Sequence, residues 1–225
     1  MRKYVLPLVF GVVGCAILAS LGVWQLQRLA WKQDILAEMD ALLLGEPWTL
    51  AEATDPKLTR FAPVRVSGRT TGEEIHVLTS IAGQGAGYRL ISAFELDQGG
   101  RMLLDEGFIP QADKDAPRPP VQLTVLGNVH RPDEVDGFTP DPDLDANIWY
   151  ARDTSAMGAH LNAYEPAMII VRQIEIGPTR AMPLPPDTST VANNHLGYAV
   201  QWFGLAIVWA GMTLFLLWRT AKRTT

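Results

Sequence analysis

The chain has 225 residues, of which 48% are hydrophobic, and a formal net charge of −5. This length holds one sizeable domain and a few membrane spans, which excludes a polytopic transporter. All acidic residues fall between Asp34 and Asp187, and such an acidic middle argues against nucleic acid as a partner.

The first element is an apolar stretch without charge from Tyr4 to Leu26. At about 1.5 Å of rise per residue, a helix of this length crosses the ~30 Å hydrocarbon layer of a bilayer. We therefore predict a transmembrane helix over residues 1–26. The only cysteine, Cys15, lies inside this stretch, so no internal disulfide supports the chain, and we expect its side chain to have a packing role.

The helical pattern continues beyond this span. Large side chains recur at four- and three-residue spacing at Trp24, Arg28, Trp31 and Ile35. We predict that the first helix projects beyond the membrane as an amphipathic segment. It is expected to stop at Gly45, because a glycine suits a left-handed cap and a proline follows two residues later.

Between Pro56 and Gly177 short runs of Val, Ile, Leu and aromatic residues alternate with turn residues, as in strands. We predict strands near residues 62–69, 74–81, 87–96, 101–109, 122–130, 148–152 and 168–176. Gly99 and Gly100 predict a hairpin turn because glycine tolerates positive φ, and Asp153 is expected to cap a short helix, Thr154–Leu161. Residues 27–192 are thus predicted to form a β-rich domain that begins with the amphipathic helix.

A second uncharged stretch, Leu196–Trp218, predicts a transmembrane helix over residues 193–218, with a basic tail over 219–225. Steps of seven residues keep to one face of a helix, and two such series lie nearly opposite each other. One is aromatic, His195, Trp202 and Trp209, and the other is Gly197, Gly204 and Gly211. Since glycine lets membrane helices approach closely, we expect the glycine series to pack against small residues of the first span, which are Gly11, Gly14, Cys15 and Gly22.

Basic residues flank both spans at the ends of the chain, at Arg2, Lys3, Arg219, Lys222 and Arg223. Lys and Arg near a span hold their side in the cytoplasm, while a long loop is exported largely regardless of its charge. We expect both termini to be cytoplasmic and the middle domain to be periplasmic. The first stretch has no cleavage site or presequence, which favours the inner membrane of a bacterium. The predicted fold class is a membrane protein of the α+β type, with two transmembrane helices flanking a β-rich extracytoplasmic domain.

Few residues suggest chemistry. The sequence has no Gly-x-Ser-x-Gly elbow, HExxH pair or Walker loop, and no acidic pair is framed as a catalytic site. His76, His130 and His160 have no second ligand at metal spacing, which favours packing or surface roles. His195 differs, because a coordinating residue at a membrane boundary suggests function. A histidine there can also simply bridge headgroups and water, and both interpretations stay open.

The two predicted helices bring further groups to the level of His195. Neutral imidazole ligates haem iron, indole rings flank porphyrins, and Arg28 or Lys32 can pair with propionates. The hypothesis is a haem site in which His195 is the iron ligand and the surrounding contacts come from Tyr198, Trp202, Trp24, Arg28, Trp31 and Lys32. An aromatic belt with basic residues that reach the interface has the same composition, so the anchoring alternative also stays open.

Two stretches resemble the Surfeit locus protein family, Shy-type assembly factors for cytochrome c oxidase. They are GVWQLQRLAWKQDI at residues 22–35 and NNHLGYAVQWFGLA at residues 193–206. Between them GYRLISAFEL, LLDEGFIP, VLGNVHRP and NIWYARDTSAM follow in family-like order. The resemblance covers nearly the whole chain, and two spans around a β-rich exported domain are also the family architecture.

The resemblance implies an assembly factor, not an enzyme, that binds haem a and aids its insertion into the largest subunit of cytochrome c oxidase. Haem a synthase is a further candidate partner. His195 matches the histidine proposed to bind haem in bacterial members. Other residues match the terminal motifs of the family: Trp24, Gln25, Arg28, Trp31 and Lys32 the N-terminal one, Tyr198 and Trp202 the C-terminal one.

Two alternatives to this reading stay open. One is a scaffold that stabilises the haem-free oxidase subunit without binding haem, with the acidic domain as its docking surface. The other is a membrane-anchored enzyme of haem chemistry, which would need a redox or acid–base constellation that the sequence does not display.

Overall fold

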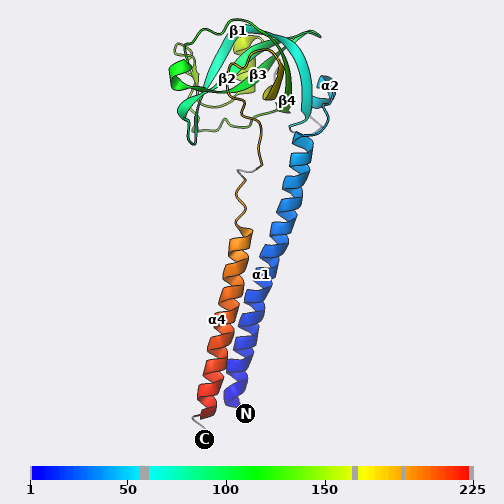
Figure 1. The fold of residues 1–225 in the computed structure, drawn as a ribbon. Helices are drawn as coiled ribbons and strands as arrows, with labels where there is room; N and C mark the ends of the chain where they lie inside the picture. The colour runs from blue at the N-terminus through cyan, green and yellow to red at the C-terminus, as the bar shows by residue number, and fades with distance from the viewer. Residues whose placement is uncertain (1, 56–60, 164–166, 189–190, 223–225) are drawn as a thin grey trace. The chain divides into compact units, whose positions relative to one another are not determined.

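The computed structural model describes residues 2–55, 61–163, 167–188 and 191–222. Its contacts divide the chain into two compact units (Figure 1). One contains the N-terminal helix as far as Met39 together with the C-terminal segment from Thr188 onward, and the other contains Asp40–Asp187. Arg223, part of the predicted basic tail, lies outside the described residues.

The first unit is a pair of long helices, α1 (Arg2–Leu43) and α4 (His195–Lys222). They run side by side in opposite directions, so that the start of α1 and the end of α4 lie at the same end of the pair (Figure 1). Both are long and apolar enough to cross a membrane, which is consistent with a membrane protein. The prediction that the first helix continues past Leu26 is confirmed, and it ends at Leu43, just before Gly45.

The contact face of α1 is made of small residues that receive larger side chains of α4. A Cβ added at Gly14 would lie 2.2 Å from the Trp209 indole nitrogen, and one at Gly22 would lie 2.7 Å from the Phe203 ring. Farther toward the start of α1, Gly11 faces Thr213. The thiol of Cys15 lies 3.7 Å from the carbonyl oxygen of Ala206. The expectation that these small residues provide close helix contact is therefore confirmed.

The partner face expected on α4 is wrong. A Cβ built at Gly197, Gly204 or Gly211 would meet no atom from elsewhere in the described chain within 4 Å, and all three glycines are exposed. The reason is steric. Small residues on α1 leave room for Trp209 and Phe203 to fill, so the bulky face of α4 turns inward and the bare face turns outward.

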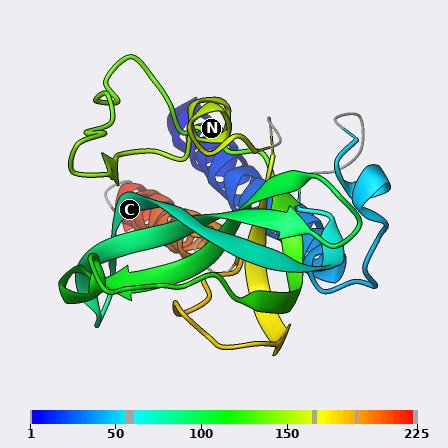
Figure 2. The same cartoon turned by 90° about the horizontal axis from the view of Figure 1, so that it is seen from above.

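The second unit is built on one six-stranded sheet in the order β2-β3-β6-β4-β1-β5, with an additional pairing of β2 to β1. The strands are β1 (Pro63–Ile81), β2 (Gly85–Leu96), β3 (Arg101–Pro110), β4 (Gln122–His130), β5 (Ile148–Trp149) and β6 (Met168–Ile176). Because β1 pairs with both β2 and β4, the strands close into a barrel, and β5 adds an edge to β1. Figure 2 looks onto this curled sheet from above.

The long strand β1 closes the barrel by pairing with two strands. Its first part, Pro63–Arg69, pairs antiparallel with β4, and its later part pairs antiparallel with β2. The register of the β1–β2 pairing shifts between Thr70 and Glu74, just after the pairing with β4 ends at Arg69. The two strands predicted at residues 62–69 and 74–81 are thus one strand with an irregularity, since such a bulge bends a strand without ending it.

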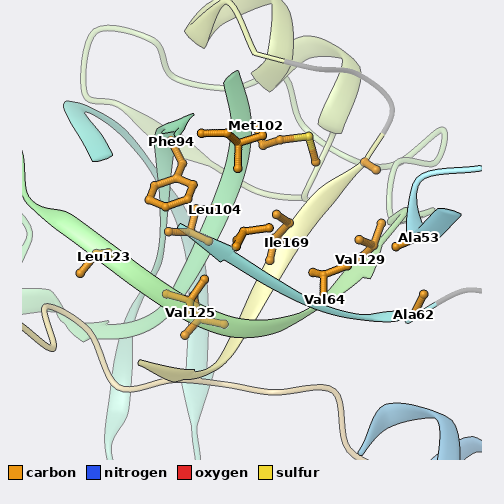
Figure 3. Packing of buried hydrophobic residues seen from close by; sticks show 14 residues of the cluster. Ala53, Ala62, Val64, Phe94, Met102, Leu104, Leu123, Val125, Val129 and Ile169 are labelled. Carbon is orange, nitrogen blue, oxygen red and sulfur yellow. The ribbon is translucent and has the colours of Figure 1, made fainter. Parts of the chain in front are cut away.

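Residues of the strands pack into separate hydrophobic clusters. Met102 and Leu104 face the barrel interior with Phe94 and Ile169, as Figure 3 shows. The intervening Leu103 faces the opposite side, where it packs with Met157. Both faces of β3 are therefore buried, which explains why its large apolar residues do not alternate with exposed polar ones.

Short helices cover the barrel. In α3 (Thr154–Leu161) the predicted cap is confirmed, because the Asp153 carboxylate accepts from the Ala156 N–H at 3.0 Å. The predicted hairpin at Gly99 and Gly100 is also confirmed, with both residues at positive φ. Two further short elements are α2 (Leu50–Ala53), capped by Thr49, and the 3-10 helix η1 (Gln111–Asp113).

The last carbonyl of α1 is held by side chains of the barrel. Leu43, which belongs to the barrel unit, accepts from the Asn128 carboxamide at 3.0 Å and from the Arg172 guanidinium. The last carbonyls of a helix have no hydrogen-bonding partner within the helix, and a cation near them interacts favourably with the negative end of the helix dipole. The helix end is thereby satisfied although Leu43 is buried.

Candidate functional site

The predicted iron ligand, His195, is the first residue of α4 and faces α1. Its ring nitrogen Nδ1 lies 2.8 Å from the side-chain oxygen of Gln25. Gln25 is only 9% exposed, whereas Gln27 and Arg28 in the same part of α1 are exposed. A buried amide is costly without a partner, and the imidazole supplies one.

A carboxamide oxygen can only accept, so Nδ1 is the donor in this contact. In the neutral ring with this hydrogen position, Nε2 keeps its lone pair. Within the described ranges, no hydrogen-bonding partner contacts Nε2. An imidazole in this state can bind a metal through Nε2 while Nδ1 is occupied, which is the arrangement common at metal-bound histidines.

Lys32 of α1 contacts the segment that leads into α4. Its ammonium group donates to the backbone carbonyl of Ala192 at 2.5 Å. The contact joins α1 to the segment immediately before His195, so it helps to fix where α4 begins. Lys32, predicted as a propionate partner, is therefore engaged with the backbone, although an ammonium group has further donors.

The remaining predicted site residues lie on the outer surface of the pair. The guanidinium of Arg28 stacks over the Trp31 ring at 4.0 Å from its centroid. Trp24, Trp31 and Tyr198 are each about half exposed, and Trp202 is partly buried. The contacts of Gly22 with Phe203 and of Gln25 with His195 put Trp24 at the level of Tyr198. The structure thus brings these groups to one end of the pair, but Gln25 alone among the described side chains hydrogen-bonds His195.

Gln25 is the residue that the site prediction left out. The sequence matches it to the family motif, yet nothing in composition separates it from Gln27 two positions later. The spacing of Gln25 from Gly22 and Lys32 could have identified it as a residue that faces α4. Gln25 follows Gly22 by three residues and precedes Lys32 by seven, which places it on the stripe that faces α4.

The histidines of the barrel are either packed or at the surface, as predicted. His76 is buried and contacts Glu74 at 3.1 Å, His130 stacks on Phe61, and His160 lies edge-on to Trp149. No group of three potential metal ligands occurs among the residues that the structure describes.

Buried charges are the other notable polar feature of the barrel, and the sequence did not single them out. Glu106 accepts from Ser92 at 2.5 Å and from the guanidinium of Arg180. Its neighbour Asp105, also fully buried, pairs with Arg89 at 2.8 Å and with Arg152 at 3.5 Å. These acids are fully paired, which indicates a structural rather than a catalytic role.

The second of these networks extends to Glu134. Burial alone would raise the pKa of the Glu134 carboxyl, but hydrogen bonds from the side chain and backbone N–H of Arg152, together with its charge, hold that pKa below its ordinary value of 4.5. Burial acts to lower the pKa of Arg152, and the carboxylates of Glu134 and Asp105 outweigh it and raise that pKa.

A surface groove of about 780 Å³ lies between η1 and the segment after β6. Its walls are mostly apolar, with Phe108 and several prolines, and its two arginines are Arg118 and Arg180. Arg118 donates to Glu74 and to backbone carbonyls, and Arg180 to Glu106 and Ser92. Because the groups that could bind an anion are already engaged, the groove offers no evident chemistry.

Comparison with known proteins gives a consistent result. The model of the SURF1 family matches residues 12–207. Surfeit locus protein 1 of Xenopus tropicalis is 32% identical over 212 residues, which cover 83% of this chain and 67% of the relative. The human protein of the same name is 28% identical, with 83% and 69% covered. A SURF1-like protein of Rickettsia felis is 29% identical, with 85% and 88% covered.

These names do not indicate an enzyme. The matched range contains both the Gln25 and His195 positions and the whole barrel. The family match and the relatives together establish that the chain belongs to the SURF1 family.

Proposed function

We propose that this protein is an assembly factor for cytochrome c oxidase that carries haem a on His195 and passes it to the largest subunit of the oxidase. Membership in the SURF1 family supports the assembly role. Haem a synthase is the proposed source of the haem. The protein acts as a carrier and needs no turnover chemistry of its own.

The observation that carries the haem proposal is the state of His195. Its Nδ1 is held by Gln25, and its Nε2 has a lone pair with no partner in the described part of the chain. Neutral imidazole with one free nitrogen is an axial ligand for haem iron. The other groups at this end of the pair suit the rest of a haem: exposed aromatic rings for the porphyrin, and the cations Arg28 and Lys32 for the propionates.

We further propose that the helix pair lies in the inner membrane of a bacterium, with both termini cytoplasmic and the barrel periplasmic. The basic residues at the chain ends support this orientation. His195 would then lie at the periplasmic boundary, where a bilayer-soluble haem and a membrane subunit of the oxidase are both accessible.

Absorbance spectroscopy tests the haem proposal directly. The full chain, purified in detergent from cells that make haem a, is expected to show a haem spectrum. His195→Ala should insert and accumulate normally, because the change leaves the span apolar. It should lose the haem spectrum, because the imidazole ligand is removed. His160→Ala, an exposed histidine of the barrel, is the matched control and should retain the haem.

Equal haem content per mole of protein in wild type and His195→Ala would contradict the ligand assignment. If both forms lack haem but still restore oxidase assembly in a strain without the gene, the protein is a scaffold. Conversion of added haem into a modified product would indicate an enzyme.

A further inference from the structure

The side-chain oxygen of Gln25 is the hydrogen-bonding partner of the His195 ring across the contact between α1 and α4. It can therefore influence which ring nitrogen carries a hydrogen and how the ring is oriented. Gln25 is the buried polar side chain of α1, and its oxygen lies 2.8 Å from Nδ1. In apolar surroundings a buried hydrogen-bonding group is costly unless it is paired, so both groups are held to this geometry.

We propose that Gln25 is a positioning residue that fixes the tautomer and the direction of the His195 ring, so that Nε2 presents its lone pair for coordination. The inference rests on the proposed function as far as haem is concerned. Its claim about the ring concerns the protein alone and is tested separately.

Two neighbouring contacts keep the distance short. Gly22, one helical turn before Gln25, has no side chain, and the Phe203 ring occupies the space that a Cβ would need. On the other side, Lys32 holds the Ala192 carbonyl just before α4. The contact between Gln25 and His195 therefore lies between two other contacts along the helix pair. One is Gly22 with Phe203, and the other is Lys32 with Ala192.

The hydrogen bond also affects the strength of coordination. An acceptor on Nδ1–H increases the basicity of Nε2 and orients the ring, and loss of such a partner typically lowers metal affinity about 10- to 100-fold. Gln25→Leu should therefore weaken haem binding by about 10- to 100-fold, although Gln25 does not touch the iron. Gln25→Glu keeps an oxygen acceptor at the same position and should restore binding.

Gln27→Leu is the matched control. It changes the same residue type in the same helix, but Gln27 is exposed and makes no hydrogen bond to His195. Its haem affinity should equal that of wild type. A loss in Gln25→Leu that reflected only weaker helix packing would not be restored by Gln25→Glu.

The tautomer is measured without haem. Nitrogen-15 NMR of the haem-free full chain in detergent, with His195 assigned from the signal missing in His195→Ala, distinguishes a protonated from an unprotonated ring nitrogen. We expect a protonated Nδ1 and an unprotonated Nε2 in wild type and Gln27→Leu, and a protonated Nδ1 in Gln25→Glu. In Gln25→Leu the hydrogen is no longer confined to Nδ1.

A wild-type hydrogen on Nε2, or a Gln25→Leu spectrum identical to wild type, would overturn the inference even if haem binding by His195 is confirmed. Conversely, if the NMR result is as expected but added haem a binds equally to wild type and His195→Ala, the ligand assignment fails and the role of Gln25 in holding the ring stands.

Discussion

The barrel and the helix pair both bury polar groups, but they satisfy them in different ways. The barrel buries full charges, with Asp105 and Glu106 each enclosed by arginines. The helix pair instead buries the uncharged amide of Gln25 against His195. Its remaining contacts depend on size, with the glycines of α1 receiving large side chains of α4.

The difference follows from what each environment can supply. In the barrel, arginines from other strands and loops reach Asp105 and Glu106 with planar guanidinium groups, so that both buried carboxylates have a partner. In an apolar helix pair an unmatched charge would have no water or counter-ion nearby, and neutral groups are less costly to bury. Charge pairing therefore helps to specify the barrel, whereas shape and a few hydrogen bonds specify the helix pair.

The largest effect is expected when one charge of the barrel is removed. Arg180→Ala leaves the carboxylate of Glu106, which is 1% exposed, without its counter-ion and should destabilise the fold by about 3–5 kcal/mol. Urea unfolding of the full chain in detergent, followed by circular dichroism, measures the change.

Arg65→Ala is the matched control for this variant. Arg65 also pairs with a glutamate, Glu175, but its side chain is 59% exposed, so its loss should cost less than about 1 kcal/mol. Replacing both buried partners, Arg180→Met with Glu106→Leu, should recover much of the lost stability. Similar losses for Arg180→Ala and Arg65→Ala would show that charge pairing does not specify the barrel.

A smaller effect is expected from adding volume to the helix pair. Gly14→Leu places a side chain where the Trp209 ring lies, and overpacking of this kind costs about 1–3 kcal/mol. Gly204→Leu adds the same side chain to the open face of α4 and should leave the pair intact. Cross-linking reports the separation of the helices, because Ala206→Cys puts a second thiol beside the native Cys15.

We expect oxidation to link Cys15 to the new cysteine at residue 206, with a reduced yield in Gly14→Leu and an unchanged yield in Gly204→Leu. The reverse order would mean that the glycine face of α4, and not its bulky face, packs against α1.

The smallest effect concerns the partly exposed carboxylate of Glu134. Its pKa in the folded state lies below the ordinary 4.5, so its contribution to stability is present above pH 4.5 and is lost as the pH falls through the lower, folded value. Glu134→Gln should therefore be less stable than wild type at pH 7, and the difference should shrink below pH 4.5.

Urea midpoints measured between pH 7 and pH 3 test this expectation. Asp133→Asn serves as the control, because Asp133 is exposed and has no arginine partner among the described residues. A stability difference for Glu134→Gln that is constant with pH would show that the Arg152 contact does not depend on the ionised carboxylate.

Local features of the fold could be predicted from sequence because they depend on neighbouring residues. The Asp153 cap, the turn at Gly99 and the strand positions follow from patterns within a few residues. Closure of the barrel by β1 could not be predicted, since it depends on pairing with β4 far along the chain. The buried state of Asp105 and Glu106 likewise depends on distant arginines.

For the candidate site, the sequence predicted that these side chains gather at one end of the helix pair, but it did not predict the contact between Gln25 and His195. Seven-residue steps show which residues share a face of α4, yet they do not show which face meets α1. That choice depends on volume on both helices, where Gly14 and Gly22 leave space and Trp209 and Phe203 fill it. The same face-to-face register brings Gln25 to His195, and it exists only in the folded pair.

The position of β6 in the sheet has a consequence for the time at which the barrel can form. This strand lies between β3 and β4, although both are synthesised before it. Until Met168–Ile176 has left the ribosome, the edges of these two strands have no partner, and unpaired edges are sites of aggregation. Pairing between strands so distant along the chain is also slow. The barrel is thus completed late in synthesis, when α4 is the one helix still to be made, and the chain is most vulnerable just before that point.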